Sequence, residues 1–95
     1  MPLFAWIGRD GPRGAELRTK HRPAHLAKLE PLARAGRVIH AGPLLDAAGK
    51  PCGSLVLFEA KDLAAARALA AADPYVRAGV FASYEVVETR RVLPA

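Results

Sequence analysis

The chain has 95 residues, which is enough for one hydrophobic core and too few for a second, so residues 1–95 are expected to form a single domain. Hydrophobic residues make up 52% and charged residues 24%, a composition that indicates a folded globular protein and excludes a disordered one. The net charge is +5, but the basic residues are scattered, which favours solubility and some attraction for small anionic ligands over a nucleic-acid surface.

The sequence also argues against a membrane or secreted protein. No apolar run approaches the ~20 residues that a membrane span needs. The short apolar run near the start has no basic segment before it, so a strand is expected there and not a signal peptide. Cys52 is the only cysteine, which makes an intramolecular disulfide impossible and fits the reducing cytoplasm; it is expected to be an inert thiol.

The first elements in chain order are a strand and a long helical region. The apolar run Leu3–Ile7 predicts a buried strand, and the RDGPRG segment after it predicts a loop. Residues 15–35 then have helical spacing, and Gly36 stands where a helix commonly ends. Because proline suits the first position of a helix and not its interior, Pro23 predicts a break with the main helix beginning there. The expected apolar stripe consists of Leu26, Leu29, Leu32 and Ala33.

The second half of the chain predicts a second helix and further strands. Asp62 is expected to cap an alanine-rich helix over residues 63–72, which the Asp73-Pro74 pair would end. A turn is expected over residues 46–53. Three more strands are expected at residues 37–45, 54–60 and 80–89.

The resulting order, βαββαβ, predicts the α+β, ferredoxin-like fold with a four-stranded antiparallel sheet and two helices on one face. The strand sequences LFAWI and SLVLF scarcely alternate, so both faces of the sheet are expected to be apolar. Two helices can cover only one of these faces. A second copy of the chain is therefore expected to cover the other, giving a homodimer.

His25 and Asp73 are the strongest candidates for chemistry. With a helix beginning at Pro23, His25 would lie in its first turn, where the positive end of the helix disfavours imidazolium. The second helix runs antiparallel to the first, so Asp73 at its end should come near His25. A carboxylate that binds one imidazole nitrogen fixes the tautomer and leaves the other nitrogen as a general base. Two simpler interpretations stay open: Asp73 is only the cap before Pro74, or His25 has only a backbone partner.

Other polar residues give weaker signals. His21 and His25 have the spacing of two metal ligands on a helix, but Pro23 disturbs that geometry and no cysteine–histidine cluster supports a site, so no metal is expected. His40 could line the same cavity or face solvent. Ser54 could donate a hydrogen bond to a ligand or cap the preceding turn.

Three blocks of sequence resemble the YCII-related (YciI-like) family: RPAHLAKL (22–29), GRVIHAGPL (36–44) and ADPYVRAGVF (72–81). The resemblance implies a dimeric α+β barrel and an active-site His–Asp dyad, whose members map onto His25 and Asp73. It also implies that four further motif positions shape the pocket: Arg22, Gly42, Pro43 and Tyr75. Some members resemble dehydrochlorinases that act on chlorinated aromatics, but the family indicates no single substrate.

The leading hypothesis is a small cofactor-independent enzyme in which His25, oriented by Asp73, performs proton abstraction, elimination or hydrolysis on a small polar or aromatic molecule. The alternative is a non-catalytic dimeric module that binds a ligand or partner. An RNA-recognition module is disfavoured because the third strand, GSLVLFEA, has one aromatic residue where such modules expose several. Haem, found in some proteins of this fold, would need an axial ligand and a larger pocket than the sequence suggests.

Overall fold

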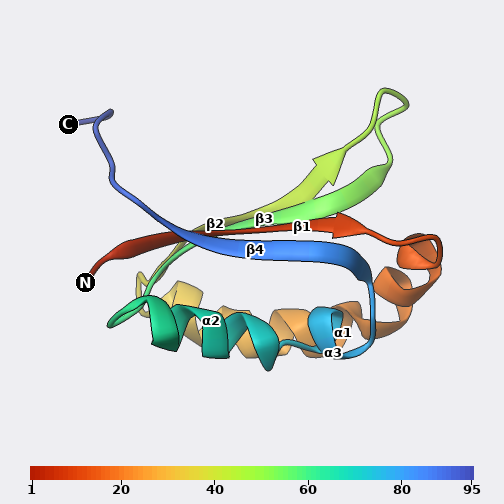
Figure 1. Ribbon diagram of the computed structural model, residues 1–95, viewed down its shortest axis with the longest axis horizontal. Coiled ribbons are helices and arrows are strands. Elements are labelled where there is room, and N and C mark those ends of the chain that lie inside the picture. Colours follow the sequence, from red (N-terminus) through yellow and green to blue (C-terminus); the bar gives the residue numbers. More distant parts are fainter.

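A computed structural model describes residues 1–95 and shows four strands forming one antiparallel sheet with the helices beneath it (Figure 1). The strand order is β2-β3-β1-β4, which is the ferredoxin-like arrangement predicted from the sequence. No helix combines the length and the apolar character that a membrane crossing requires. The elements are β1 (Leu3–Asp10), α1 (Gly14–Arg34), β2 (Val38–Leu45), β3 (Pro51–Glu59), α2 (Leu63–Ala71), α3 (Pro74–Arg77) and β4 (Phe81–Thr89).

One face of the sheet packs against the helices and forms the core. Trp6 of β1 is paired with Val56 of β3 and Val86 of β4, so the three side chains lie in one row on the same face. Leu29 of α1 closes over this face. The fully buried residues of α2 are the small Ala66 and Ala70, and its partly buried Leu63 and Leu69 pack against the core. The buried core consists of Phe4, Trp6, Leu29, Val56, Phe58, Ala60, Ala66, Ala70 and Val86.

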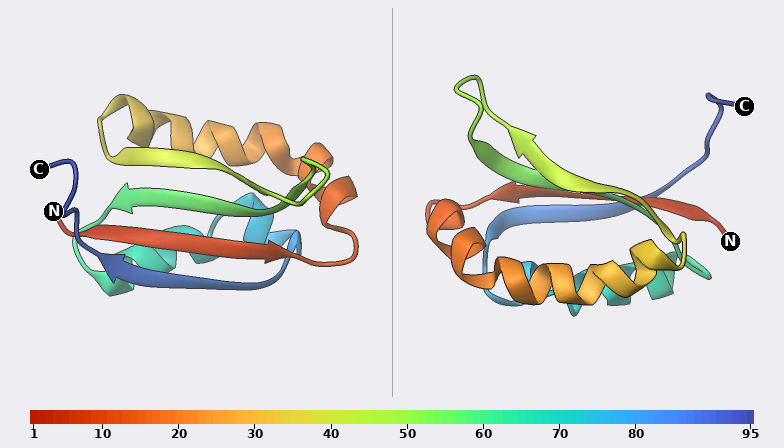
Figure 2. Two further views of the ribbon diagram at one scale, coloured as in Figure 1. Left: turned by 90° about the horizontal axis from the view of Figure 1, so that it is seen from above. Right: turned by 180° about the vertical axis from the view of Figure 1, so that it is seen from behind.

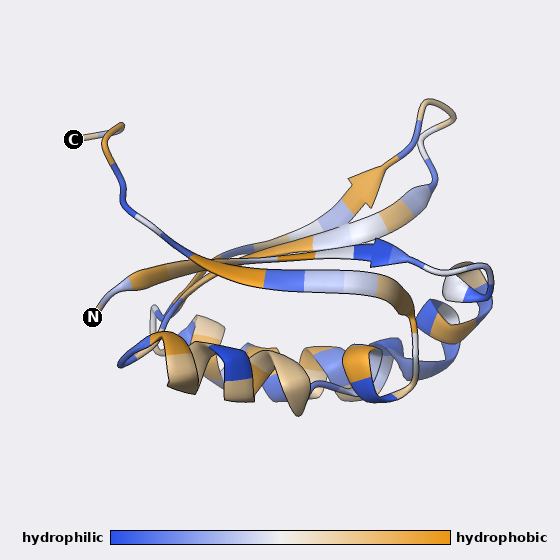
Figure 3. Cartoon of the chain, in the orientation of Figure 1, coloured by the Kyte–Doolittle hydropathy of each residue, from blue (hydrophilic) through white to orange (hydrophobic).

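The other face of the sheet carries no helix (Figure 2). Here Ala5 is paired with both Leu57 and Val87, and Ile7 is paired with Leu55. These apolar side chains alternate with the core residues along β1 and β3, so both faces of the two central strands carry apolar side chains. Figure 3 colours the hydrophobic residues of the strands orange. The expectation that two helices cover one face and leave a second apolar face is confirmed.

The prediction that Pro23 begins the main helix is wrong. The α1 helix runs without a break from Gly14 to Arg34 and contains Pro23 and Pro31 in its interior. An interior proline removes one backbone hydrogen bond and costs ~3 kcal/mol. Both prolines lie on the exposed side of the helix, where water can reach the carbonyl oxygens that lose their partners. Packing of the inner side of α1 against the sheet and α3 therefore outweighs this local preference.

The buried side of α1 also differs from the predicted apolar stripe. Of its four residues only Leu29 is fully buried, whereas Leu26 is 44% exposed and Ala33 is exposed. The fully buried side chains of the helix are His25 and Leu29, which are four residues apart. A polar side chain thus occupies a core-facing position in the middle of the longest helix.

The ends of the helices follow the predicted capping residues. The Asp62 side chain accepts a hydrogen bond from the backbone N–H of Ala65 at 2.8 Å and begins α2. Gly36 has a φ of 74°, a left-handed conformation that favours glycine, and it follows the end of α1. Asp73 directly follows Ala72, the last cap residue of α2. It also caps the one-turn helix α3, which was not predicted as a separate element.

Candidate functional site

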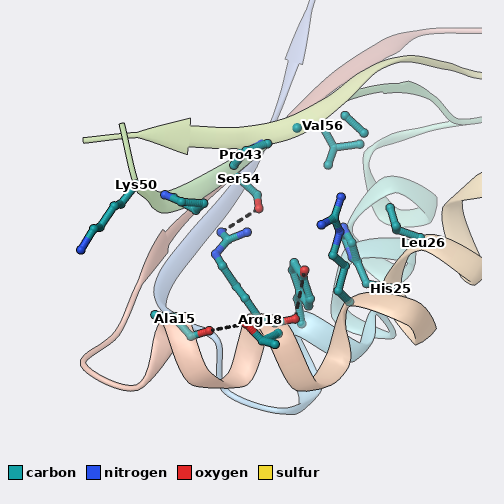
Figure 4. Close-up of a pocket in the computed structure, with 14 residues that line it drawn as sticks. Ala15, Arg18, His25, Leu26, Pro43, Lys50, Ser54 and Val56 are labelled. Carbon is teal, nitrogen blue, oxygen red and sulfur yellow. Dashed lines mark hydrogen bonds between the residues drawn. The ribbon is translucent and has the colours of Figure 1, made fainter. Parts of the chain in front are cut away.

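A cavity of about 420 Å³ lies between α1 and the β2–β3 hairpin (Figure 4), within the range of ~300–1,000 Å³ usual for small-molecule sites. The inner side of α1 forms one wall, with Arg18, Arg22 and His25 four and three residues apart and therefore on one face of the helix. Pro43, Ser54 and Val56 of the hairpin form the opposite wall, and Tyr75 also lines the cavity.

His25 and Asp73 form a buried hydrogen-bonded pair. The distance between His25 Nδ1 and Asp73 Oδ1 is 2.7 Å, and the two side chains are 8% and 0% exposed. The same carboxylate oxygen accepts the backbone N–H of Tyr75 at 2.8 Å. Because an ionised carboxylate can only accept, Nδ1 is the donor in this pair. His25 Nε2 makes no hydrogen bond within the chain, and the ring lines the cavity.

The pair comes together through the packing of α1 on α3, although not in the way the sequence suggested. His25 lies in the middle of α1 and not in a first turn, so the positive end of the helix does not act on it. Lys28, one turn further on, donates a hydrogen bond from Nζ to the Ala72 carbonyl oxygen at 3.2 Å and holds α1 against the end of α2. Asp73 is at once the cap of α3 and the partner of His25, so it is not only a cap, and the partner of His25 is a side chain and not only the backbone.

Tyr75 connects the pair to the rest of the site. Its ring stacks on the His25 ring with centroids 3.9 Å apart and planes 3° from parallel. Trp6 contacts His25 edge-on from the sheet side, with ring centroids 6.2 Å apart. Burial raises the pKa of the Tyr75 hydroxyl, and the positive charge of Arg18 opposes this increase. The His25 imidazole is thus held by the Asp73 carboxylate, the stacked Tyr75 ring and the edge-on Trp6 ring, which together fix its orientation.

Arg18 is a site residue that the sequence analysis did not single out. Its Nε and Nη2 donate to the two Asp10 carboxylate oxygens at 2.7 and 2.8 Å, and Nη2 also donates to Ser54 Oγ at 2.9 Å. The guanidinium carbon lies 5.2 Å from the centre of the Tyr75 ring. The spacing of Arg18, Arg22 and His25 was the signal that could have revealed it, but only on an unbroken helix.

The structure brings most of the predicted site residues to this cavity. Arg22, His25, Gly42, Pro43, Ser54 and Tyr75 line it, and Asp73 lies directly behind His25. Ser54 lies inside β3, which begins at Pro51, and it is 4% exposed. His40 does not line the cavity: it is exposed and pairs with Leu57, on the face of the sheet that has no helices. No three side chains of the metal-ligating kinds converge in the structure.

Comparison with known proteins agrees with this fold. The model of the YCII-related domain matches residues 2–90. The chain is 40% identical to the protein YciI of Escherichia coli over 96 aligned positions, which cover 95% of this chain and 98% of that protein. It is 37% identical to an uncharacterized protein of Haemophilus influenzae, covering 94% of this chain and 97% of the relative.

Among solved structures, the chain is similar to 5-chloro-2-hydroxyhydroquinone dehydrochlorinase (TftG) from Burkholderia phenoliruptrix, solved in complex with 2,5-dihydroxybenzoquinone. The TM-score is 0.84 and the identity 30%, with 94% of each chain covered. The fold is also that of an antibiotic biosynthesis monooxygenase, with a TM-score of 0.58 at 16% identity over 97% of this chain and 99% of that one. By the match of the domain model and the identity to YciI over almost the whole length, the chain belongs to the YCII-related family.

Proposed function

We propose that the protein is a small cofactor-independent enzyme in which His25 acts as a general base and acid on a small polar or aromatic molecule bound in the cavity. The observation that carries this proposal is the buried pair of His25 Nδ1 and Asp73 Oδ1 at 2.7 Å, which leaves Nε2 as the one imidazole nitrogen free to meet a substrate. A histidine held in one tautomer in this way is the usual form of a positioned general base.

The reaction that fits this base is the removal of a proton followed by elimination. In its neutral form His25 takes a proton from an acidic C–H or O–H of the substrate at Nε2. The electron pair left behind forms a new double bond and expels a leaving group, such as a halide, as an anion. The imidazolium formed on His25 is stabilised by the Asp73 carboxylate, and it returns its proton to water or to the product.

The similarity to TftG supports a reaction of this class, because a dehydrochlorinase removes the elements of hydrogen chloride from its substrate. The likeness extends over 94% of both chains at 30% identity, so it covers the elements that carry His25, Asp73 and the cavity. The substrate of this chain is therefore sought first among hydroxylated and chlorinated aromatic or quinoid molecules.

Turnover by the wild-type protein and by two variants tests the proposal. Chloride release from 5-chloro-2-hydroxyhydroquinone, named for the structural relative, is measured first, followed by other halogenated hydroxyaromatics. His25→Ala is expected to lower the rate by about 10²-fold or more, the usual contribution of a general base. Asp73→Asn is expected to lower it less. His21→Ala is the control, because His21 lies one turn earlier on α1 and does not line the cavity.

A binding module without catalysis predicts a different outcome. In that case the wild-type protein binds the aromatic compounds but releases no chloride, and the His25→Ala variant changes affinity alone. Turnover that survives in His25→Ala at the wild-type rate would likewise refute the role of His25 as the base.

We further propose that the protein works as a homodimer in which a second copy covers the open face of the sheet. Ile7, Leu55, Leu57 and Val87 form an apolar patch there around the buried Ala5, and no helix of the same chain covers this face. Burial of such a surface is favourable by ~25 cal/mol per Å² of apolar area, and monomeric proteins rarely expose large patches of this kind. Light scattering is expected to give the mass of two chains for the wild type and of one chain for Leu57→Asp. A wild-type monomer at micromolar concentration would contradict the proposal.

A further inference from the structure

The permanently charged side chains that line the cavity are all cations. Arg18, Arg22 and Lys50 line it, and none of the residues that line it is an aspartate or a glutamate. Arg18 is paired with Asp10, whereas Arg22 of α1 and Lys50 of the turn between β2 and β3 form no ion pair, so a ligand meets positive charge from both sides of the cavity. This distribution disfavours a cationic ligand and favours a negatively charged one.

Arg18 is held so that part of its guanidinium group remains available. Its Nε and Nη2 hydrogens are used by Asp10 and Ser54, whereas Nη1 makes no hydrogen bond within the chain. The side chain is 11% exposed and Asp10 is 10% exposed, so the ion pair is fixed and largely shielded from water. Figure 4 shows Arg18 rising from α1 into the cavity toward Ser54. The two Nη1 hydrogens are thus pre-oriented donors that lack an acceptor.

Ser54 supplies a further donor at the same place. Its Oγ accepts the Arg18 Nη2–H at 2.9 Å, so the hydroxyl hydrogen is free to point elsewhere, and it has no other partner in the chain. Ser54 is 4% exposed and lies on a rigid strand. Two fixed donor groups, with Arg22 and Lys50 nearby, form a site complementary to a negatively charged oxygen.

We propose that Arg18 and Ser54 form an anion-binding subsite, and that the substrate of this enzyme carries a negatively charged oxygen which they bind while His25 acts on another atom of the molecule. The inference rests on the proposed function, which makes His25 the group that acts on the substrate. It adds the chemical class of that substrate. Arg18 and His25 are seven residues apart on one helix, about 10 Å along its axis. A small ring with one anionic substituent spans most of this distance.

The charged oxygen could belong to a carboxylate or to an ionised enol or phenol, and two matched pairs of probes distinguish these sources. Benzoate and benzamide have nearly the same shape, but only benzoate is charged. The second pair is 2,5-dihydroxybenzoquinone, the ligand of the structural relative, which ionises readily in water, and 2,5-dimethoxybenzoquinone, which cannot ionise. Binding to the wild-type protein is measured by calorimetry at about 0.15 M salt, where distant surface charges are screened.

At least one anion is expected to bind about 10-fold or more tightly than its neutral counterpart, as a charge-assisted hydrogen bond predicts. The pair with the larger difference identifies the source of the charge. The double variant Asp10→Asn with Arg18→Gln removes both charges of the buried pair together and is expected to abolish the preference. Arg34→Gln is the control: it removes one charge from an exposed arginine of the same helix and should change affinity less than about 2-fold.

Equal binding of charged and neutral probes overturns the proposal, as does a preference that survives in the double variant. Should the double variant fail to fold, Ser54→Ala serves instead and is expected to weaken anion binding by about 2- to 10-fold, the effect of one neutral hydrogen bond; no weakening would contradict the subsite. His25→Ala is expected to keep the preference for the anion. Failure of the proposed catalysis would appear as turnover in His25→Ala, whereas failure of the subsite would appear in the binding data alone.

Discussion

Replacement of Asp73 by alanine is expected to destabilise the protein far more than the same replacement of Asp62, although both residues cap a helix. Asp62 is exposed and accepts a single backbone N–H at 2.8 Å. Losing such a cap costs ~1 kcal/mol. Asp73 is fully buried and accepts two donors, the Tyr75 N–H and the His25 Nδ1–H.

The size of the effect follows from those two donors. Each buried donor left without a partner costs ~1–3 kcal/mol, so Asp73→Ala is expected to cost about 2–6 kcal/mol. A domain of this length has a free energy of unfolding of only ~5–14 kcal/mol. The variant should therefore lose a large part of its stability. Asp73→Asn should lose less, since its amide oxygen can still accept both hydrogens while its NH₂ takes the place of Oδ2, which has no partner.

Urea unfolding provides the assay, because Trp6 is the only tryptophan, is 1% exposed and contacts the His25 ring. With a slope of about 1–3 kcal/mol per molar urea, Asp73→Ala should lower the midpoint by about 1 M or more and Asp62→Ala by less. All variants are compared at one protein concentration, since association would add to apparent stability. Equal midpoints for the two alanine variants would refute the account of Asp73 as a partner of His25.

Two further results are expected. Because burial raises the pKa of Tyr75 above its ordinary value of 10.0, the native state holds this proton more tightly than the unfolded state does. In a Tyr84→Phe variant the midpoint of the phenolate absorbance should therefore lie above pH 10.0, and stability should fall as pH rises toward that midpoint; a midpoint at or below 10.0 would contradict this. Gly8→Ala would bring a Cβ to 2.7 Å from the Phe81 ring and should cost ~1–3 kcal/mol, whereas at Gly42 the nearest atom is 3.4 Å away and the cost in thermal unfolding should be smaller.

The order and type of the main elements could be predicted because each has a local signal. Asp62 before an alanine-rich run indicates a helix beginning, and its side chain makes the expected capping bond. The unalternating strands indicated a sheet that is apolar on both faces, and the pairing of Ile7 with Leu55 opposite the core confirms it. These signals depend on residues that are close together in the sequence, so they can be recognised without knowing how the rest of the chain folds.

The course of α1 could not be predicted in the same way. Pro23 carries a strong local preference against a helix interior, and the helical spacing of residues 15–35 alone does not decide between one helix and two. What overrides it is the contact of His25 with Asp73 and of Leu29 with the core, which join parts of the chain far apart in sequence. The same error hid Arg18, because a helix broken at Pro23 does not place it on one face with His25.

The hairpin opposite α1 brings a separate segment of the chain to the cavity. The turn that joins β2 to β3 is ordered by Asp46, whose Oδ1 accepts the backbone N–H groups of Ala48 and Lys50 at 2.8 and 3.0 Å. Lys50 and Pro51 then reach the cavity, and Figures 1 and 2 show that the hairpin curls away from the body of the sheet. Insertions or replacements in this turn would reshape the mouth of the cavity without moving His25 or Asp73. If the proposed function holds, selectivity can be altered on the hairpin while the proposed catalytic pair on the helical layer stays constant, which makes this turn the segment to randomise when new substrates are sought.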